Sequence, residues 1–173
     1  MNRILFFLLL TIFVNPVNAY TLKFTEADLQ KQVSAMMPLE TKQLFLTINI
    51  SDPVVKLLKS ENKINIKTNI EAIIPGGIKG TGNINITGTL SYNNKNGTFY
   101  FKDPVINEMH VDNVAEKYQS SIKDLAQDSI VKAMSTRPVY TLRDDNEKHT
   151  LAKSVLKSMM VKNGILIVEL APF

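Results

Sequence analysis

Two histidines are the side chains of this sequence best suited to acid–base or metal chemistry near neutral pH, and they stand far apart. His110 belongs to a predicted extended segment and His149 to a predicted helix. Neither has a second histidine at the H-x-x-x-H spacing that places two metal ligands on one helix face. The chain also has no cysteine, which excludes thiol catalysis and thiolate metal sites. The sequence therefore predicts no metal site.

Other reactive groups lack the context that catalysis requires. Ser120 and Ser121 lie within a predicted helix, outside the G-x-S-x-G turn that exposes a nucleophilic serine. Asp144 and Asp145 are adjacent at the expected start of a helix, where a carboxylate caps free N–H groups. The glycines of the segment 76–82 are not followed by the G-K-[ST] ending of a phosphate loop, so they predict a hairpin connection. We therefore expect neither an enzyme nor a cofactor, and a hydrolase is the weakest of the candidate functions.

The N-terminal residues 1–19 have the pattern of a secretory signal peptide. Met1–Arg3 is basic and Ile4–Val14 is apolar apart from one threonine; Pro16 then breaks the run, and the small residues Val17 and Ala19 form a cleavage motif. The apolar run is shorter than the roughly 20 residues that span a bilayer. We expect cleavage after Ala19, a single domain over residues 20–173 without a transmembrane helix, and a location in the bacterial periplasm. An uncleaved N-terminal anchor is the alternative.

The composition is that of a folded domain with a hydrophobic core. Hydrophobic residues make up 45% of the chain, which separates it from disordered sequences. Without disulfides, an exported chain depends on core burial, which suits the periplasm better than the disulfide-rich secreted class. The net charge of +4 is mild and the lysines are dispersed, so nucleic acid is not an expected partner.

Alternating apolar and polar residues predict a series of β-strands joined by short turns. The strands are expected at 44–50, 54–58, 64–74, 83–92 and 99–111. The turns between them contain Asp52-Pro53, Ser60-Glu61-Asn62, Pro75-Gly76-Gly77 and Asn93–Gly97. Short turns between consecutive strands make the sheet antiparallel, with one isoleucine-rich face and one wet face rich in asparagine and threonine.

Three helices are expected beside these strands. The first begins after an N-cap at Thr25, with Asp28 placed for a capping box, and ends at Pro38. The second spans 114–134 and is amphipathic, with several small residues in its apolar stripe. The third begins at Asp144 or Asp145, and its inward residues are Leu151, Val155, Leu156 and Met159.

Two short strands complete the chain. One is expected at 139–142, before the third helix, and the other at 165–170. Asn163-Gly164 is a strong signal for a tight hairpin turn in front of the final strand.

These apolar faces predict an α+β fold in which a strongly curved antiparallel sheet wraps around the long amphipathic helix. Composition leaves two interiors open, a packed core or a lipid-sized cavity, because pockets for apolar ligands are lined much as cores are. The Tyr118 hydroxyl is the candidate polar anchor for a ligand. The predicted ligand-binding residues are Leu46, Ile48, Ile66, Ile70, Ile84, Ile86, Tyr118, Ile122 and Leu125.

Three segments resemble the YceB-like family of bacterial envelope proteins, whose function is poorly defined. They are Tyr20–Leu29, Ile50–Leu57 and Met160–Val168. The resemblance covers most of the mature chain and implies a tubular lipid-binding type of fold. Family members of the lipoprotein type carry a cysteine after the signal, whereas this chain has Tyr20 there, so we expect no lipid anchor.

The leading hypothesis is therefore a non-enzymatic periplasmic protein that binds a lipid, a fatty acid or another apolar ligand between sheet and helix. The competing hypothesis is a structural or interaction protein of the envelope, with a packed core and a protein partner. Such a protein would expose an apolar patch or a sheet edge. Phe99, Tyr100 and Phe101 are the best candidates for that patch.

Overall fold

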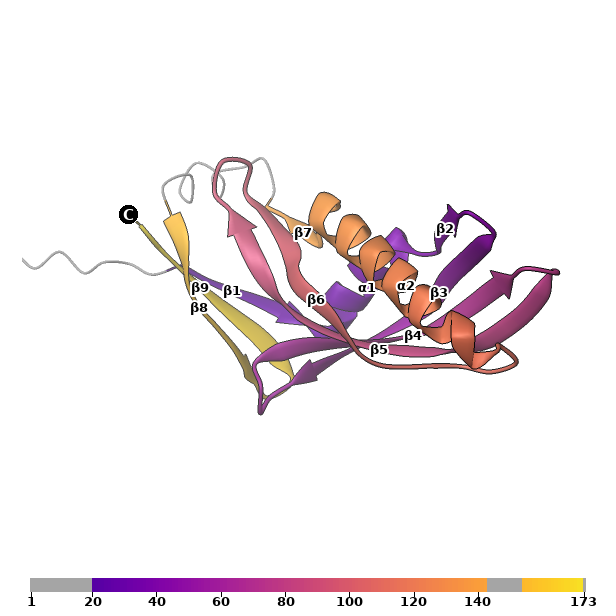
Figure 1. Ribbon diagram of the computed structural model, residues 1–173. Coiled ribbons are helices and arrows are strands. Elements are labelled where there is room, and N and C mark those ends of the chain that lie inside the picture. The colour runs from indigo at the N-terminus through magenta and orange to yellow at the C-terminus, as the bar shows by residue number, and fades with distance from the viewer. Residues whose placement is uncertain (1–19, 143–153, 173) are drawn as a thin grey trace, which may run out of the picture.

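The computed structural model describes residues 20–142 and 154–172, which form two antiparallel sheets and two helices (Figure 1). The larger sheet has six strands in chain order: β2 (Leu39–Gln43), β3 (Leu46–Leu58), β4 (Lys63–Ile74), β5 (Ile78–Asn93), β6 (Thr98–Val111) and β7 (Tyr140–Thr141). The smaller sheet has the order β1 (Tyr20–Thr25), β9 (Ile165–Pro172), β8 (Ser154–Lys162). The helices are α1 (Glu26–Met36) and α2 (Glu116–Thr136).

The core is one cluster that joins the buried face of the larger sheet with buried residues of α2, α1 and the smaller sheet. Alternate residues of β4 from Ile64 to Ile74 are buried, so the predicted period of two in this segment is confirmed. α2 buries one stripe against the sheet and packs on β6, β2 and β3. The buried residues of this helix are Ile122, Leu125, Ala126, Ser129, Ile130 and Met134.

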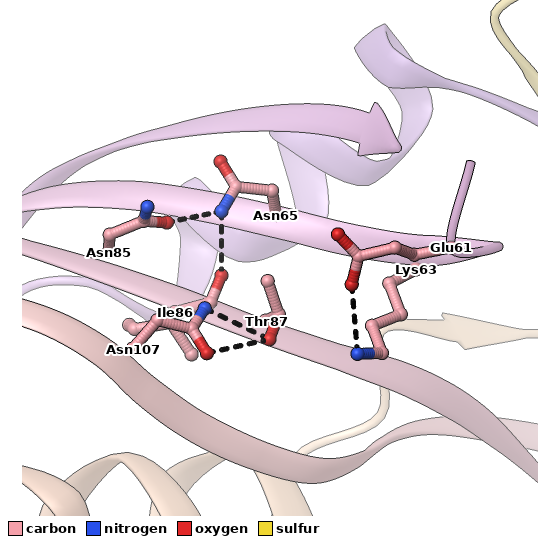
Figure 2. Close-up of polar contacts among 7 residues, drawn as sticks. All are labelled: Glu61, Lys63, Asn65, Asn85, Ile86, Thr87 and Asn107. Carbon is pink, nitrogen blue, oxygen red and sulfur yellow. Dashed lines mark hydrogen bonds and ion pairs between the residues drawn. The ribbon is translucent and has the colours of Figure 1, made fainter. Parts of the chain in front are cut away.

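The other face of the larger sheet is polar and bonded to itself (Figure 2). Asn65 on β4 donates to the side chain of Asn85 on β5 and, at 3.2 Å, to the carbonyl of Ile86. Thr87 on β5 and Asn107 on β6 are joined by side-chain hydrogen bonds of 3.0 and 3.3 Å. These amides link three neighbouring strands, which explains why a face rich in asparagine stabilises a sheet.

The predicted fold class is wrong. The chain is mostly β-structure, its strands form two separate sheets, and neither sheet closes around a long amphipathic helix. A helix enclosed by a sheet must be apolar on all sides. α2 does not meet this condition, because Lys123, Asp124 and Asp128 are exposed on its outer side. The tubular arrangement implied by the family resemblance is overturned with it.

Several predicted elements also differ from the structure. Residues expected to end a third helix form β8, which pairs with β9 from Val155↔Ala171 to Lys162↔Ile165 around the predicted Asn163-Gly164 turn. Two strands expected at 44–50 and 54–58 are one strand, β3, with an irregular register between Ser51 and Val54. The strands β1 and β2 were not predicted. The proposed signal peptide, the caps Asp144 and Asp145, and His149 lie outside the described residues.

The predicted start of α1 is confirmed. Thr25 accepts a hydrogen bond from the Asp28 N–H at 3.1 Å, and the Asp28 carboxylate accepts one from the Thr25 N–H at 2.9 Å. This capping box fixes the point where β1, in the smaller sheet, passes into the helix that packs against β3. It therefore helps to set how the two sheets are connected.

Side chains of both helices cover open edges of the larger sheet. Gln30 of α1 accepts from the Val55 N–H at 2.8 Å and donates to the Pro53 carbonyl at 2.6 Å. Gln127 of α2 does the same for β6, accepting from the Ile106 N–H at 3.0 Å and donating to the Pro104 carbonyl at 2.7 Å. Unpaired edges invite association with other strands. At each edge, one N–H and one carbonyl are therefore already occupied within the chain.

Glu26 makes a related contact that predicts a pH dependence. The Leu57 N–H, which donates to Glu26 Oε1 at 2.8 Å, holds the pKa of this carboxyl below its ordinary value of 4.5, and Lys56 acts in the same direction. A pKa lowered by folding stabilises the protein above the unfolded value and loses its effect as the pH falls through the folded value. Glu26→Gln should therefore lower the free energy of unfolding at pH 7, by about 1 kcal/mol or less for a partly exposed group. Urea unfolding at pH 7 and pH 3 tests this, since the difference should shrink as the pH falls below 4.5; a constant difference would contradict the assignment.

Candidate functional site

Most of the predicted ligand-binding residues lie in the packed core. Leu46 and Tyr118 are half-buried at the margin of the layer between sheet and α2. The other seven are at most 5% exposed: Ile48, Ile66, Ile70, Ile84, Ile86, Ile122 and Leu125. All nine therefore belong to one hydrophobic cluster or pack against it, and only Leu46 and Tyr118 remain partly accessible. Their contact with a ligand stays a prediction.

A pocket of about 370 Å³ opens at this margin, in the size range of small-molecule sites. We call it the tip pocket. Its lining residues are Gln43, Leu44, Phe45, Leu46, Pro75, Tyr118, Ser121, Asp124, Leu125 and Asp128. Three predicted residues, Leu46, Tyr118 and Leu125, are among them. The pocket lies between the β2–β3 turn, the β4–β5 turn and the first half of α2.

The β2–β3 turn supplies the most exposed apolar side chains of the described chain. Gln43 pairs with Leu46, so Leu44 and Phe45 alone form the turn. Leu44 is 81% exposed and Phe45 is 71% exposed. Hydrophobic alternation had predicted both residues inside a strand. Leu44, Phe45 and Leu46 are three consecutive large apolar residues, which interrupt the alternation of apolar and polar residues. This interruption could have located the turn.

A hydrogen bond between β2 and α2 positions this turn over the helix. Ser129 Oγ lies 2.8 Å from Thr41 Oγ1 and donates at 2.6 Å to the Leu125 carbonyl. Ser129 is a small, buried residue in the apolar stripe of α2, so the edge strand can approach the helix closely. The side of the tip pocket formed by the β2–β3 turn is thereby attached to α2, which forms the opposite side.

The rim of the tip pocket is polar and acidic. Asp124 and Asp128 contribute two carboxylates from α2, and Gln43 and Ser121 contribute an amide and a hydroxyl. Lys117 lies beside this rim, with its Nζ 5.0 Å from the centre of the Tyr118 ring. Carboxylates accept hydrogen bonds and repel anions. The rim therefore suits a ligand whose polar end carries hydroxyl or amine donors, and it disfavours an ionised fatty acid.

Outside the tip pocket, the described residues offer few groups for acid–base or metal chemistry. His110 Nε2 lies 2.9 Å from Asp112 Oδ1, and both side chains are exposed, away from the tip pocket. No group of three or more histidine, aspartate or glutamate side chains within residues 20–142 and 154–172 is arranged to hold a metal ion.

A larger hollow of about 820 Å³ lies along β5, β6 and the second half of α2. It contains none of the predicted ligand residues, and its lining includes Val105, Val131 and Ser135.

The prediction of an exposed apolar patch at Phe99-Tyr100-Phe101 is wrong, because Phe99 and Phe101 are buried at 0% and 3% exposure. Both rings belong to the core, because Phe99 and Phe101 lie on the same face of β6 and other parts of the protein cover that face.

The fold and the pocket define a β-rich protein with two sheets and an apolar recess under a hairpin turn. The chain belongs to the family described as "Protein of unknown function (DUF1439)", whose model matches residues 24–165. This match confirms a family of unknown function, and the YceB-like name stays a prediction. A search among curated proteins found no match.

Two solved structures are similar at a low level. P47 of Clostridium botulinum E1 is 12% identical with a TM-score of 0.46, covering 86% of this chain and 36% of that one. A lipopolysaccharide binding protein is 12% identical with a TM-score of 0.39, covering 87% of this chain and 40% of that one. This chain thus spans well under half the length of either structure. Similarity at this level assigns neither a fold nor a function.

In the part of the chain that the structure describes, neither helix combines the length and hydrophobicity that crossing a membrane requires.

Proposed function

We propose that this protein is a non-enzymatic periplasmic protein that binds the acyl chain of a lipid in the tip pocket. The observation that carries the proposal is the coincidence of a 370 Å³ recess with half-buried Leu46 and Tyr118 and with exposed Leu44 and Phe45 at its entrance. Burying such surfaces against a chain is worth about 25 cal/mol per Å². The periplasmic location is supported by the signal-peptide pattern of residues 1–19.

The size of the pocket guides the choice of a probe ligand. At roughly 30 Å³ for a water-sized group, it has room for about twelve such groups. A methylene is of similar size, so a twelve-carbon chain is a suitable probe. Because Asp124 and Asp128 lie at the rim, we expect a neutral head with hydroxyl groups to bind better than a carboxylate.

The first experiment is native mass spectrometry of the protein purified from the periplasm, followed by organic extraction. A lipid present at near-stoichiometric amount supports the proposal. The delipidated protein is then titrated with monolauroylglycerol and with laurate, which share one chain and differ in the head. We expect the glycerol ester to bind at least tenfold more tightly at pH 7. A clean apo mass and no uptake of either probe would instead favour a packed interaction protein.

Two serine variants on α2 locate the site. Ser121→Phe places a ring in the tip pocket and should weaken monolauroylglycerol binding at least tenfold, whereas Ser135→Phe places the same ring in the larger hollow and should leave binding unchanged. Both serines are exposed, so both variants should fold like the unaltered protein. Loss of binding in Ser135→Phe alone would move the site to the larger hollow.

A further inference from the structure

We propose that the end of the molecule carrying the tip pocket docks on the surface of a lipid bilayer, with the β2–β3 and β4–β5 turns entering its headgroup region. This inference rests on the proposed function in one respect: a docked molecule would have the tip pocket open toward the bilayer, which would supply its lipid ligand. The two turns lie side by side, since Phe45 and Pro75 line the same pocket and both turns are at one end of the larger sheet (Figure 1).

Exposed apolar side chains lie at both turns. Leu44 and Phe45 have the largest exposed fractions among the exposed large hydrophobics of the described residues, and Ile78, the first residue of β5 after the neighbouring turn, is 52% exposed. Ile78 pairs directly with Ile74, which is buried in the core, so its side chain is on the same face of the sheet as α2. Leu44 and Phe45 line the tip pocket, and Ile78 lies outside it at the same end of the larger sheet.

Leu44 occupies a backbone conformation that a leucine adopts at a cost. Its φ is +52°, in the left-handed region that favours glycine or asparagine in tight turns. An exposed leucine gains no packing in return, so a polar residue would serve the fold better at this position. Strained residues with no structural benefit are candidates for function. Contact with an apolar phase is the function that this side chain fits.

The charges near the turns fit a membrane surface. Gln43–Leu46 and Ile73–Ile78 contain no ionisable side chain, and the first charged residues beyond them are Lys42 and Lys79. With about 3.4 Å per residue, Lys42 lies about 7 Å behind Leu44 and Lys79 about 3 Å behind Ile78, where lipid phosphates are within reach when apolar groups enter the interface. Lys79 also pairs with Glu71 at 3.3 Å, but both side chains are exposed, so phosphate can compete for it.

Attraction to anionic lipid is not the expected driving force. Asp124 and Asp128 also face this end of the molecule and offset the two lysines. Docking should therefore depend on burial of Leu44, Phe45 and Ile78, and respond little to salt.

The experiment is flotation of the purified protein with phosphatidylethanolamine vesicles containing a minor share of phosphatidylglycerol. The unaltered protein should bind, and Leu44→Ser/Phe45→Ser should bind at least tenfold more weakly. The matched control is Val54→Ser/Val105→Ser, which removes two exposed valines far from the turns and should bind unchanged. Vesicles that fail to bind the protein, or equal losses in both pairs, would overturn the proposal.

Two further variants separate docking from ligand binding. Ile78 does not line the pocket, so Ile78→Ser should weaken vesicle binding severalfold and leave monolauroylglycerol binding unchanged. Ser121→Phe should do the opposite. Sedimentation without vesicles measures whether the same surface instead binds a second copy of the chain. A dimer that Leu44→Ser/Phe45→Ser dissociates would overturn membrane docking.

Discussion

Ile122→Asp is expected to unfold the protein and not merely to empty a ligand site. Ile122 is fully buried at the centre of the interface between α2 and the larger sheet. An uncompensated buried charge costs about 3–5 kcal/mol, which is comparable with the whole stability of a small domain. Circular dichroism during urea unfolding should show a loss of at least about 3 kcal/mol, or no cooperative transition.

The control is Ser120→Asp, which adds the same charge two positions earlier on the exposed side of α2. Its effect should lie within about 0.5 kcal/mol, as for other surface substitutions. A stable Ile122→Asp variant would mean that this part of the core is hydrated or open. It would then favour a cavity deep between sheet and helix over the tip pocket.

This contrast separates the roles of neighbouring residues on one helix. The hydrophobic stripe of α2 identified Ile122 and Leu125 as inward-facing, and both are buried. Periodicity cannot distinguish a residue that touches the sheet from one that touches a ligand, because both are apolar and inward. Ser121 was set aside as lacking a catalytic context, yet it offers the more informative test because it borders the pocket without supporting the core.

The strands of the larger sheet were predictable because its two faces differ chemically. In β4, isoleucines of the buried face alternate with Asn65, Lys67 and Asn69 on the other face, so the period of two is visible without a partner. The capping box of α1 and the Asn163-Gly164 turn were predictable because each depends on contacts within four residues.

Elements whose structure depends on distant partners were missed. β1 is a six-residue strand only because it pairs with β9, from Tyr20↔Leu170 to Thr25↔Ile165, at the other end of the chain. β8 carries apolar residues that also fit a helical spacing, and pairing with β9 decides between the two. The separation into two sheets, which overturned the predicted fold class, follows from these long-range pairings.

The tip pocket was missed for a geometric reason. Its Leu44 and Phe45 form a two-residue turn between β2 and β3, and β2 itself is held by contact with α2 through Thr41 and Ser129. Without that contact the segment continues the alternation of the following strand. The predicted site therefore shares Leu46, Tyr118 and Leu125 with the tip pocket but lacks the turn that forms its entrance.

Phe99→Ala is expected to cause the largest loss of stability among truncations of aromatic residues. Phe99 on β6 is fully buried and packs with Phe24 of β1 at 5.5 Å between ring centres, with Tyr92 of β5 at 4.7 Å and with Tyr140 of β7 at 6.3 Å. Removal of a buried phenylalanine ring costs about 3–5 kcal/mol. Phe45→Ala is the matched control, because the same truncation at a 71% exposed position should change the free energy of unfolding by less than about 0.5 kcal/mol.

Phe24 makes this cluster a link between the two sheets, since its ring also lies 4.9 Å from that of Tyr140. If the sheets form one cooperative unit, urea unfolding of Phe99→Ala should give a single transition by every probe. Phe24→Ala and Phe99→Ala should then be coupled in a double-mutant cycle by about 1 kcal/mol, as expected for an edge-to-face ring pair. Two separate transitions, or additive effects, would mean that the smaller sheet unfolds independently, and the predicted single domain over residues 20–173 would be wrong.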